Sequence, residues 1–184
     1  MIRYKTWLIT AIALFGVGIV SGLAAPTSMV NLLSGEIAAL EDFASLLAPL
    51  PKFLVFLIIL IKNTSTLMLS FILSPILCLV PILALTLNGW LIGFVSNVIV
   101  QEASLWFLIA GLLPHGVFEL PALILGEAAA LSFGTVAILA LFKKERRKLL
   151  VPNLKQNLKY LLIAFALLLP AAIMETFVTP LLLT

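Results

Sequence analysis

The chain has 184 residues, 63% of them hydrophobic and 10% charged, with a formal net charge of +3 and a mean hydropathy of +1.26. Since a soluble domain is about 45–50% apolar and about 25% charged, this chain has too few polar residues to cover a surface in water. The composition excludes a soluble globular protein, a disordered chain and a nucleic-acid binder. It predicts an all-α polytopic membrane protein with one transmembrane domain over residues 1–184. The single Cys78 excludes an intrachain disulfide, and the single His115 excludes a site built on two imidazoles of one chain.

The first apolar segment predicts a transmembrane helix at about 7–25, which ends before Pro26. The segment also resembles a secretory signal peptide, because Arg3 and Lys5 precede it and the small residues at 22–25 resemble a cleavage site. Its apolar run is longer than that of a usual signal peptide. We therefore expect an uncleaved first helix.

Residues 36–48 follow a different pattern, with apolar side chains at helical spacing and acidic side chains between them. The apolar set is Ile37, Leu40, Phe43, Ala44 and Leu47, and the acidic set is Glu36, Glu41 and Asp42. This spacing predicts a short amphipathic helix on the outer membrane surface. Because its polar face is acidic, we do not expect it to bind anionic lipids.

Residues 53–100 form a nearly continuous apolar stretch that is long enough for two crossings of the membrane. Pro75 and Pro81 bracket the expected turn between them, because proline weakens a continuing helix. We expect the second helix at about 55–76 and the third at about 80–99.

The next apolar stretch, 104–142, is too long for one simple crossing. Pro114 and Gly116 interrupt it and predict a break between two segments. We expect a short interfacial or re-entrant helix at 104–113. The last two crossings are expected at about 116–142 and about 159–180.

Basic residues cluster in the loop 143–158 and at its boundary. Seven of the eleven lie there: Lys143, Lys144, Arg146, Arg147, Lys148, Lys155 and Lys159. By the positive-inside rule this loop lies in the cytoplasm with Arg3 and Lys5, which requires an even number of crossings between them and agrees with the four predicted. The expected topology is five helices in the cell membrane with the N-terminus inside and the C-terminus outside. A second interpretation, that the loop binds anionic lipid headgroups or an acidic partner, stays open.

Three acidic residues fall inside the predicted helices: Glu119, Glu127 and Glu175. An ionisable side chain within the bilayer costs at least about 2.5 kcal/mol and marks a candidate functional site. Further polar side chains in these helices are His115, Asn88, Asn63, Asn97 and Lys62. From the distances to the helix ends, an outer layer is expected to contain His115, Glu119, Glu175, Asn97 and Lys62. A layer near mid-depth is expected to contain Glu127, Asn88 and Asn63.

His115 and Glu119 lie one helical turn apart on one face of the fourth helix. The same side continues with small residues at a spacing of four: Ala122, Gly126, Ala130 and Gly134. In a bilayer such a ridge allows another helix to approach closely, either in a homodimer or within one chain. An irregular start to this helix is predicted by Pro114, Gly116 and Pro121.

The polar cluster is compatible with several chemical roles. As a structural latch or an ion site it would use His115, Glu119 and Glu175, and as a path for an ion or small solute it would use the layered acids. An intramembrane hydrolase with Glu119 as base and His115 as acid is a further alternative. The sequence contains neither the HExxH pattern of zinc proteases nor the GxSxG pattern of serine hydrolases. We therefore assign no catalytic residue, no metal and no cofactor.

Residues 111–122 carry a longer motif, Gly-x-x-Pro-His-Gly-x-x-Glu-Leu-Pro-Ala. This motif resembles the signature of the stage II sporulation protein M family of integral membrane proteins. The matched positions are Pro114, His115, Gly116, Glu119, Leu120 and Pro121. Weaker similarities lie at Lys62-Asn63-Thr64 and at Asn88-Gly89 with Gly93. Glu127 departs from the family pattern, in which a small residue is expected.

The resemblance covers nearly the whole chain and implies a multi-helix membrane protein. In spore-forming bacteria the namesake of the family acts as a membrane anchor for peptidoglycan-degrading enzymes during engulfment and is not itself the enzyme. The resemblance therefore implies a non-enzymatic scaffold. We expect it to be a homodimer in the lipid bilayer with a membrane or extracytoplasmic protein partner. An ion or small-solute transporter or channel is the alternative hypothesis, and a sporulation role does not follow.

Overall fold

The computed structural model describes residues 4–31, 35, 38, 42, 45–102 and 105–182. This part of the chain contains no strand, and five of its helices are long and apolar enough to cross a membrane. The predicted fold class, an all-α protein with about five transmembrane helices, is thereby confirmed. The long helices are α1 (Tyr4–Leu23), α3 (Lys52–Leu73), α4 (Leu79–Glu102), α5 (Leu105–Phe142) and α6 (Leu150–Ile173). Most of the amphipathic segment expected at 36–48 lies outside the described residues.

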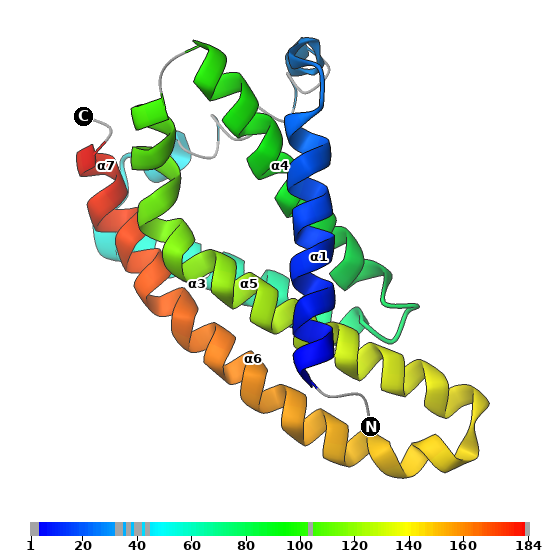
Figure 1. The fold of residues 1–184 in the computed structure, drawn as a ribbon. Helices are drawn as coiled ribbons and strands as arrows, with labels where there is room; N and C mark the ends of the chain where they lie inside the picture. Colours follow the sequence, from blue (N-terminus) through cyan, green and yellow to red (C-terminus); the bar gives the residue numbers. More distant parts are fainter. Residues whose placement is uncertain are drawn as a thin grey trace.

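The long helices form two pairs, with α3 packed beside the second pair (Figure 1). α1 packs mainly on α4, α5 packs mainly on α6, and α3 contacts both α5 and α6. The shorter elements are η1 (Thr27–Asn31), η2 (Lys144–Leu149), the π-helical turn η3 (Met174–Val178) and α7 (Thr179–Leu182). In Figure 1 the start of α1 and η2 lie toward one end of the molecule, and α7 lies toward the other.

α1 and α4 meet through glycines at a spacing of four on both helices: Gly18 and Gly22 on α1, and Gly89 and Gly93 on α4. A Cβ atom on these four glycines would overlap backbone carbonyl oxygens of the facing helix, in turn those of Thr86, Trp90, Phe15 and Ile19. Lipid tails are as apolar as leucine, so close contact between small residues is a main source of helix association in a bilayer. Gly22, which also suggested a signal-peptide cleavage site, is therefore a packing residue of α1.

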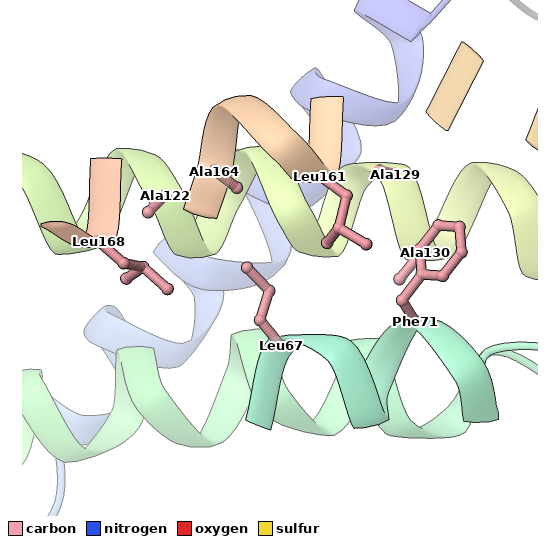
Figure 2. Packing of buried hydrophobic residues seen from close by; sticks show 8 residues of the cluster. All are labelled: Leu67, Phe71, Ala122, Ala129, Ala130, Leu161, Ala164 and Leu168. Atoms are coloured by element: carbon pink, nitrogen blue, oxygen red, sulfur yellow. The ribbon is translucent and has the colours of Figure 1, made fainter. Parts of the chain in front are cut away.

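α5 is the central helix of the bundle. In the apolar part of its membrane-spanning segment, Gly116–Phe142, 50% of the residues are buried, compared with 22–33% in the other four membrane-spanning segments. One side of α5 packs against α3 and α6, and Figure 2 shows Leu67 and Phe71 of α3 reaching toward α5 and α6. Another side packs against α1 and α4 through Ala128 and Leu131. Small residues on α5 therefore let four helices gather around it.

The segments expected separately at 104–113 and 116–142 are continuous in the structure, because α5 runs through Pro114 and Pro121 without ending. A proline inside a helix removes one backbone hydrogen bond, and the helix can bend there and continue. Figure 1 shows the axis of α5 turning in its first part. The irregular start of this helix is thus a bend rather than a gap.

α6 begins at Leu150, within the segment expected as the loop 143–158. Its first turns bury Asn153 and Asn157 against α5, so polar residues that are typical of a loop are interior contacts here. The connection between α5 and α6 is therefore shorter than expected and consists mainly of η2.

α3 and α4 are joined by a tight turn in which Leu77 and Cys78 have positive φ values of 52° and 54°. This left-handed backbone costs roughly 1–2 kcal/mol for a residue other than glycine. The turn is held against α5, where Cys78 Sγ lies 3.6 Å from Thr135 Oγ1 and Gly134 leaves room for the Ser74 carbonyl. The turn lies in the region that the prolines of the sequence predicted.

Candidate functional site: polar contacts inside the helix bundle

Glu127 is a fully buried acidic residue in the membrane-spanning part of α5, with 0% relative exposure. The Ser70 hydroxyl of α3 donates a hydrogen bond to Glu127 Oε2 at 2.5 Å. Among the described residues, Glu127 Oε1 has no hydrogen-bond partner. Because an ionisable group in hydrocarbon is costly and usually functional, this pair is the first candidate for a site inside the membrane.

The small-residue ridge of α5 brings α3 close enough for this contact. All four residues of the ridge are buried: Ala122, Gly126, Ala130 and Gly134. A Cβ on Gly126 would meet the Leu67 side chain, and a Cβ on Gly134 would overlap the Ser74 carbonyl oxygen. The ridge therefore packs within the chain, which is one of the two uses that its spacing predicted, because α3 covers it at Gly126 and Gly134.

A second polar contact joins α6 to α5 near the turn η2. The side-chain amides of Asn153 and Asn157 donate hydrogen bonds to Ser132 Oγ at 3.3 and 3.2 Å. Asn157 also donates to Asn153 Oδ1 at 2.9 Å, and all three residues are buried. This group was not predicted from the sequence. Two asparagines one helical turn apart, on the side of the helix opposite the lysines, nevertheless indicate an interior helix face.

A third contact joins α1 to both helices of the α5–α6 pair. The Tyr4 hydroxyl donates a hydrogen bond to the Leu125 carbonyl oxygen at 2.7 Å. The ring of Tyr4 stacks on that of Tyr160, with centroids 3.4 Å apart and planes within 5°. Tyr4 was also missed, because it precedes the first predicted helix and no feature of the sequence marks its distant partner.

The polar residues expected at mid-depth do not form one cluster. Asn88 is exposed and donates a hydrogen bond to the Ala84 carbonyl of its own helix at 2.7 Å, while Asn63 is half-buried on α3. Asn97, expected in the outer layer, donates to the Ala25 carbonyl just past α1 at 3.3 Å. The depth of a residue in the membrane could not predict which side of α4 is buried, because apolar residues lie on all sides of this helix.

Two half-buried acids of the layer expected near the outer face lie on neighbouring elements. Glu119 lies on α5 and Glu175 lies in the π-helical turn η3, which packs against α3 and α5. Pro170 precedes this turn and removes a backbone hydrogen bond from α6. The side chain of His115 lies outside the described residues. The expected latch of His115, Glu119 and Glu175 stays a prediction.

The described residues also bear on metal and thiol chemistry. They contain no group of three or more His, Cys, Asp or Glu side chains arranged to hold a metal ion. Burial raises the pKa of the Cys78 thiol above its ordinary value of 9.0. This disfavours the thiolate form that nucleophilic attack requires.

A family model described as Stage II sporulation protein M matches residues 11–180. The chain belongs to the stage II sporulation protein M family. The match includes the glycine contact of α1 with α4, the Glu127–Ser70 pair and the asparagine group of α6. These interior contacts therefore lie within the part of the chain that matches the stage II sporulation protein M family.

One similar protein is an uncharacterized protein of Methanocaldococcus jannaschii, which is 30% identical over 97 residues. The alignment covers 52% of this chain and 54% of that protein, so the chain spans about half the length of this relative. No solved structure matches the chain significantly. Membership of the stage II sporulation protein M family thus identifies a class of membrane protein, and the molecular role must be inferred from the interior contacts.

Proposed function

We propose that the protein is a non-enzymatic membrane scaffold. The observation that carries this proposal is that buried polar groups join one helix to another. They link α5 to α3, α6 and α1 through the pairs Glu127–Ser70, Asn157–Ser132 and Tyr4–Leu125. Together with the glycine contact of α1 and α4, these links favour one fixed arrangement of helices. A fixed outer surface suits a scaffold, whereas transport by alternating access requires one bundle to move against another.

The distribution of charge supports an orientation with η2 in the cytoplasm of the cell. Basic residues are concentrated in and beside η2, and the start of α1 lies toward the same end of the molecule in Figure 1. Cytoplasmic loops carry an excess of lysine and arginine. In this orientation the start of α3 and α7 face outward, where a membrane or extracytoplasmic protein partner would bind.

Photo-crosslinking in native membranes tests the scaffold proposal. A photo-reactive amino acid replaces Phe53, which is 68% exposed near the outer start of α3, or Val17, which is 65% exposed on α1 and serves as the control. The proposal expects a discrete protein adduct from position 53 and lipid adducts alone from position 17. Lipid adducts alone from both positions in the native host would contradict it.

An ion or small-solute path is the second candidate function, because one observation favours it. Glu127 Oε1 is buried without a hydrogen-bond partner among the described residues, and intramembrane acids often bind protons or ions during transport. This candidate requires a flux that depends on the Glu127 carboxyl group. The scaffold proposal instead assigns Glu127 the role of an interhelical acceptor for Ser70.

A further inference from the structure

The turn between α5 and α6 carries a concentrated positive charge on its surface. We define the basic turn as residues 143–159, and all seven of its lysine and arginine residues are exposed. They are Lys143, Lys144, Arg146, Arg147, Lys148, Lys155 and Lys159, with Glu145 as the one acid in this range. The charge is therefore largely uncompensated within the turn itself.

Exposed apolar residues flank the basic turn on both sides. Leu141 and Phe142 at the end of α5 are 72% and 81% exposed, and Val151 at the start of α6 is 61% exposed. Farther along α6, Leu158 and Leu162 are 41% and 65% exposed on the helix that carries Lys155 and Lys159. Apolar side chains with this much exposed surface are suited to contact with lipid tails. The basic side chains between them therefore lie at the depth of the lipid headgroups.

A side-chain hydrogen bond holds the shape of the turn, and the start of α6 adds to its positive potential. Arg147 Nε donates a hydrogen bond to the Ala140 carbonyl at 3.3 Å, which ties η2 back to the end of α5. α6 begins without an acidic residue in its first turn and without a side-chain cap, so the positive end of its helix dipole is not offset locally.

The cavity beside the turn is small. It has a volume of about 30 Å³ and is lined in part by Trp7, Thr135, Arg146 and Asn153. This volume accommodates about one water molecule and is too small for a lipid headgroup. Binding would therefore occur on the exposed face of the turn and depend on charge more than on headgroup shape.

We propose that the basic turn binds the anionic headgroups of phospholipids in the surrounding leaflet. Clusters of four to eight basic residues next to a transmembrane helix attract anionic lipid. Arginine and lysine both bind phosphate oxygens, arginine often through two parallel hydrogen bonds. The flanking apolar residues favour a lipid over an acidic protein as the occupant, because they place the charges against the bilayer itself. The proposal is independent of the scaffold function.

Fluorescence energy transfer to labelled lipid tests this proposal on the full chain. The purified protein is reconstituted in phosphatidylcholine vesicles that contain traces of pyrene-labelled phosphatidylcholine, phosphatidylglycerol or phosphatidylserine. Trp7 lies beside the basic turn and acts as the donor, with Trp90 and Trp106 replaced by Phe. We expect more transfer to both anionic lipids than to the neutral one, at similar levels for the two anionic headgroups. This preference should largely disappear in 1 M salt, where the screening length falls to about 3 Å.

A charge-removing variant and a matched control complete the experiment. Replacing Lys144, Arg146 and Lys148 together by Gln should lower the anionic preference by at least about fivefold, since each basic residue near the surface contributes about that factor. Lys52→Gln removes a charge at the start of α3 and should leave the preference unchanged. Equal transfer to neutral and anionic lipid in the wild-type protein would overturn the proposal. An anionic preference that survives both 1 M salt and the triple substitution would also overturn it.

Discussion

Adding one methyl group at Gly18 is expected to loosen the contact between α1 and α4. A Cβ on Gly18 would overlap the Thr86 carbonyl oxygen and would lie 3.0 Å from the Trp90 nitrogen and 3.1 Å from the Gly89 Cα. These are backbone atoms of a helix, so they cannot rotate away as a side chain can. Gly18→Ala therefore requires α1 and α4 to move apart along their shared surface.

The size of this effect follows from the contacts around two glycines of the same helix. A Cβ on Gly16 meets nothing within 4 Å, so Gly16→Ala is a control that changes helix propensity in the same way. Overpacking a close contact typically costs about 1–3 kcal/mol. We expect Gly18→Ala to be less stable than Gly16→Ala by about this amount.

Thermal unfolding of the two purified variants in the same detergent measures the difference. Each kcal/mol lowers the unfolding temperature by roughly 2–4 °C for a chain of this length, so several degrees should separate the variants. The tryptophan fluorescence of Trp90, which stacks on Phe94 at the α1–α4 contact, gives a local signal. Equal unfolding temperatures would refute the inference that backbone contact at Gly18 holds α1 on α4.

Three further predictions follow from the buried polar groups. Glu127→Gln keeps an acceptor for Ser70 and should change the free energy of unfolding less than Glu127→Ala, which leaves the hydroxyl without its partner at a cost of about 1–3 kcal/mol; equal effects would show that the hydrogen bond contributes little. Asn157→Ala should lower stability in detergent by about 1 kcal/mol, the usual range for hydrogen bonds between membrane helices, and no change would exclude this role. Because burial raises the pKa of the Cys78 thiol, its labelling by maleimide should become fast only at a higher pH than the labelling of an exposed cysteine. The double variant Cys78→Ala, Glu145→Cys supplies that exposed cysteine, and identical pH profiles for the two proteins would contradict the prediction.

The number of helices could be predicted from the sequence because it depends only on the length of each apolar segment along the chain. Each crossing requires about 20 apolar residues, and the chain supplies five such segments separated by prolines, glycines or charges. The turn between α3 and α4 was likewise marked by Pro75 and Pro81. These features need no knowledge of which helices are neighbours.

The partners of each polar residue could not be predicted, because they depend on which face of a helix meets which neighbour. Glu127 was recognised as unusual from its position within an apolar segment, but Ser70 is an ordinary serine until α3 is placed against α5. The helices of this chain are apolar on all sides, so the alternation that usually marks a buried face is absent. Asn88 shows the consequence, since its depth in the membrane was predicted to match that of Glu127, but its side chain is exposed while Glu127 is buried.

Spacing of small residues was the more reliable guide to helix neighbours. The ridge of α5 was found from its spacing of four, and the same rule applied to Gly18 and Gly22 would have predicted a second close contact. What spacing alone could not decide was whether the α5 ridge meets a second copy or α3 of the same chain.

A flux measurement on reconstituted vesicles tests the central claim most directly, which is that the polar groups inside the bundle join helices and do not form a path. Vesicles with a pH gradient and an imposed membrane potential would contain wild-type protein, the Glu127→Gln variant or no protein, with correct folding checked by unfolding in detergent. The scaffold account predicts the same slow proton and cation leak in all three preparations. A leak that is faster with the wild-type protein and returns to the protein-free level with folded Glu127→Gln would contradict it.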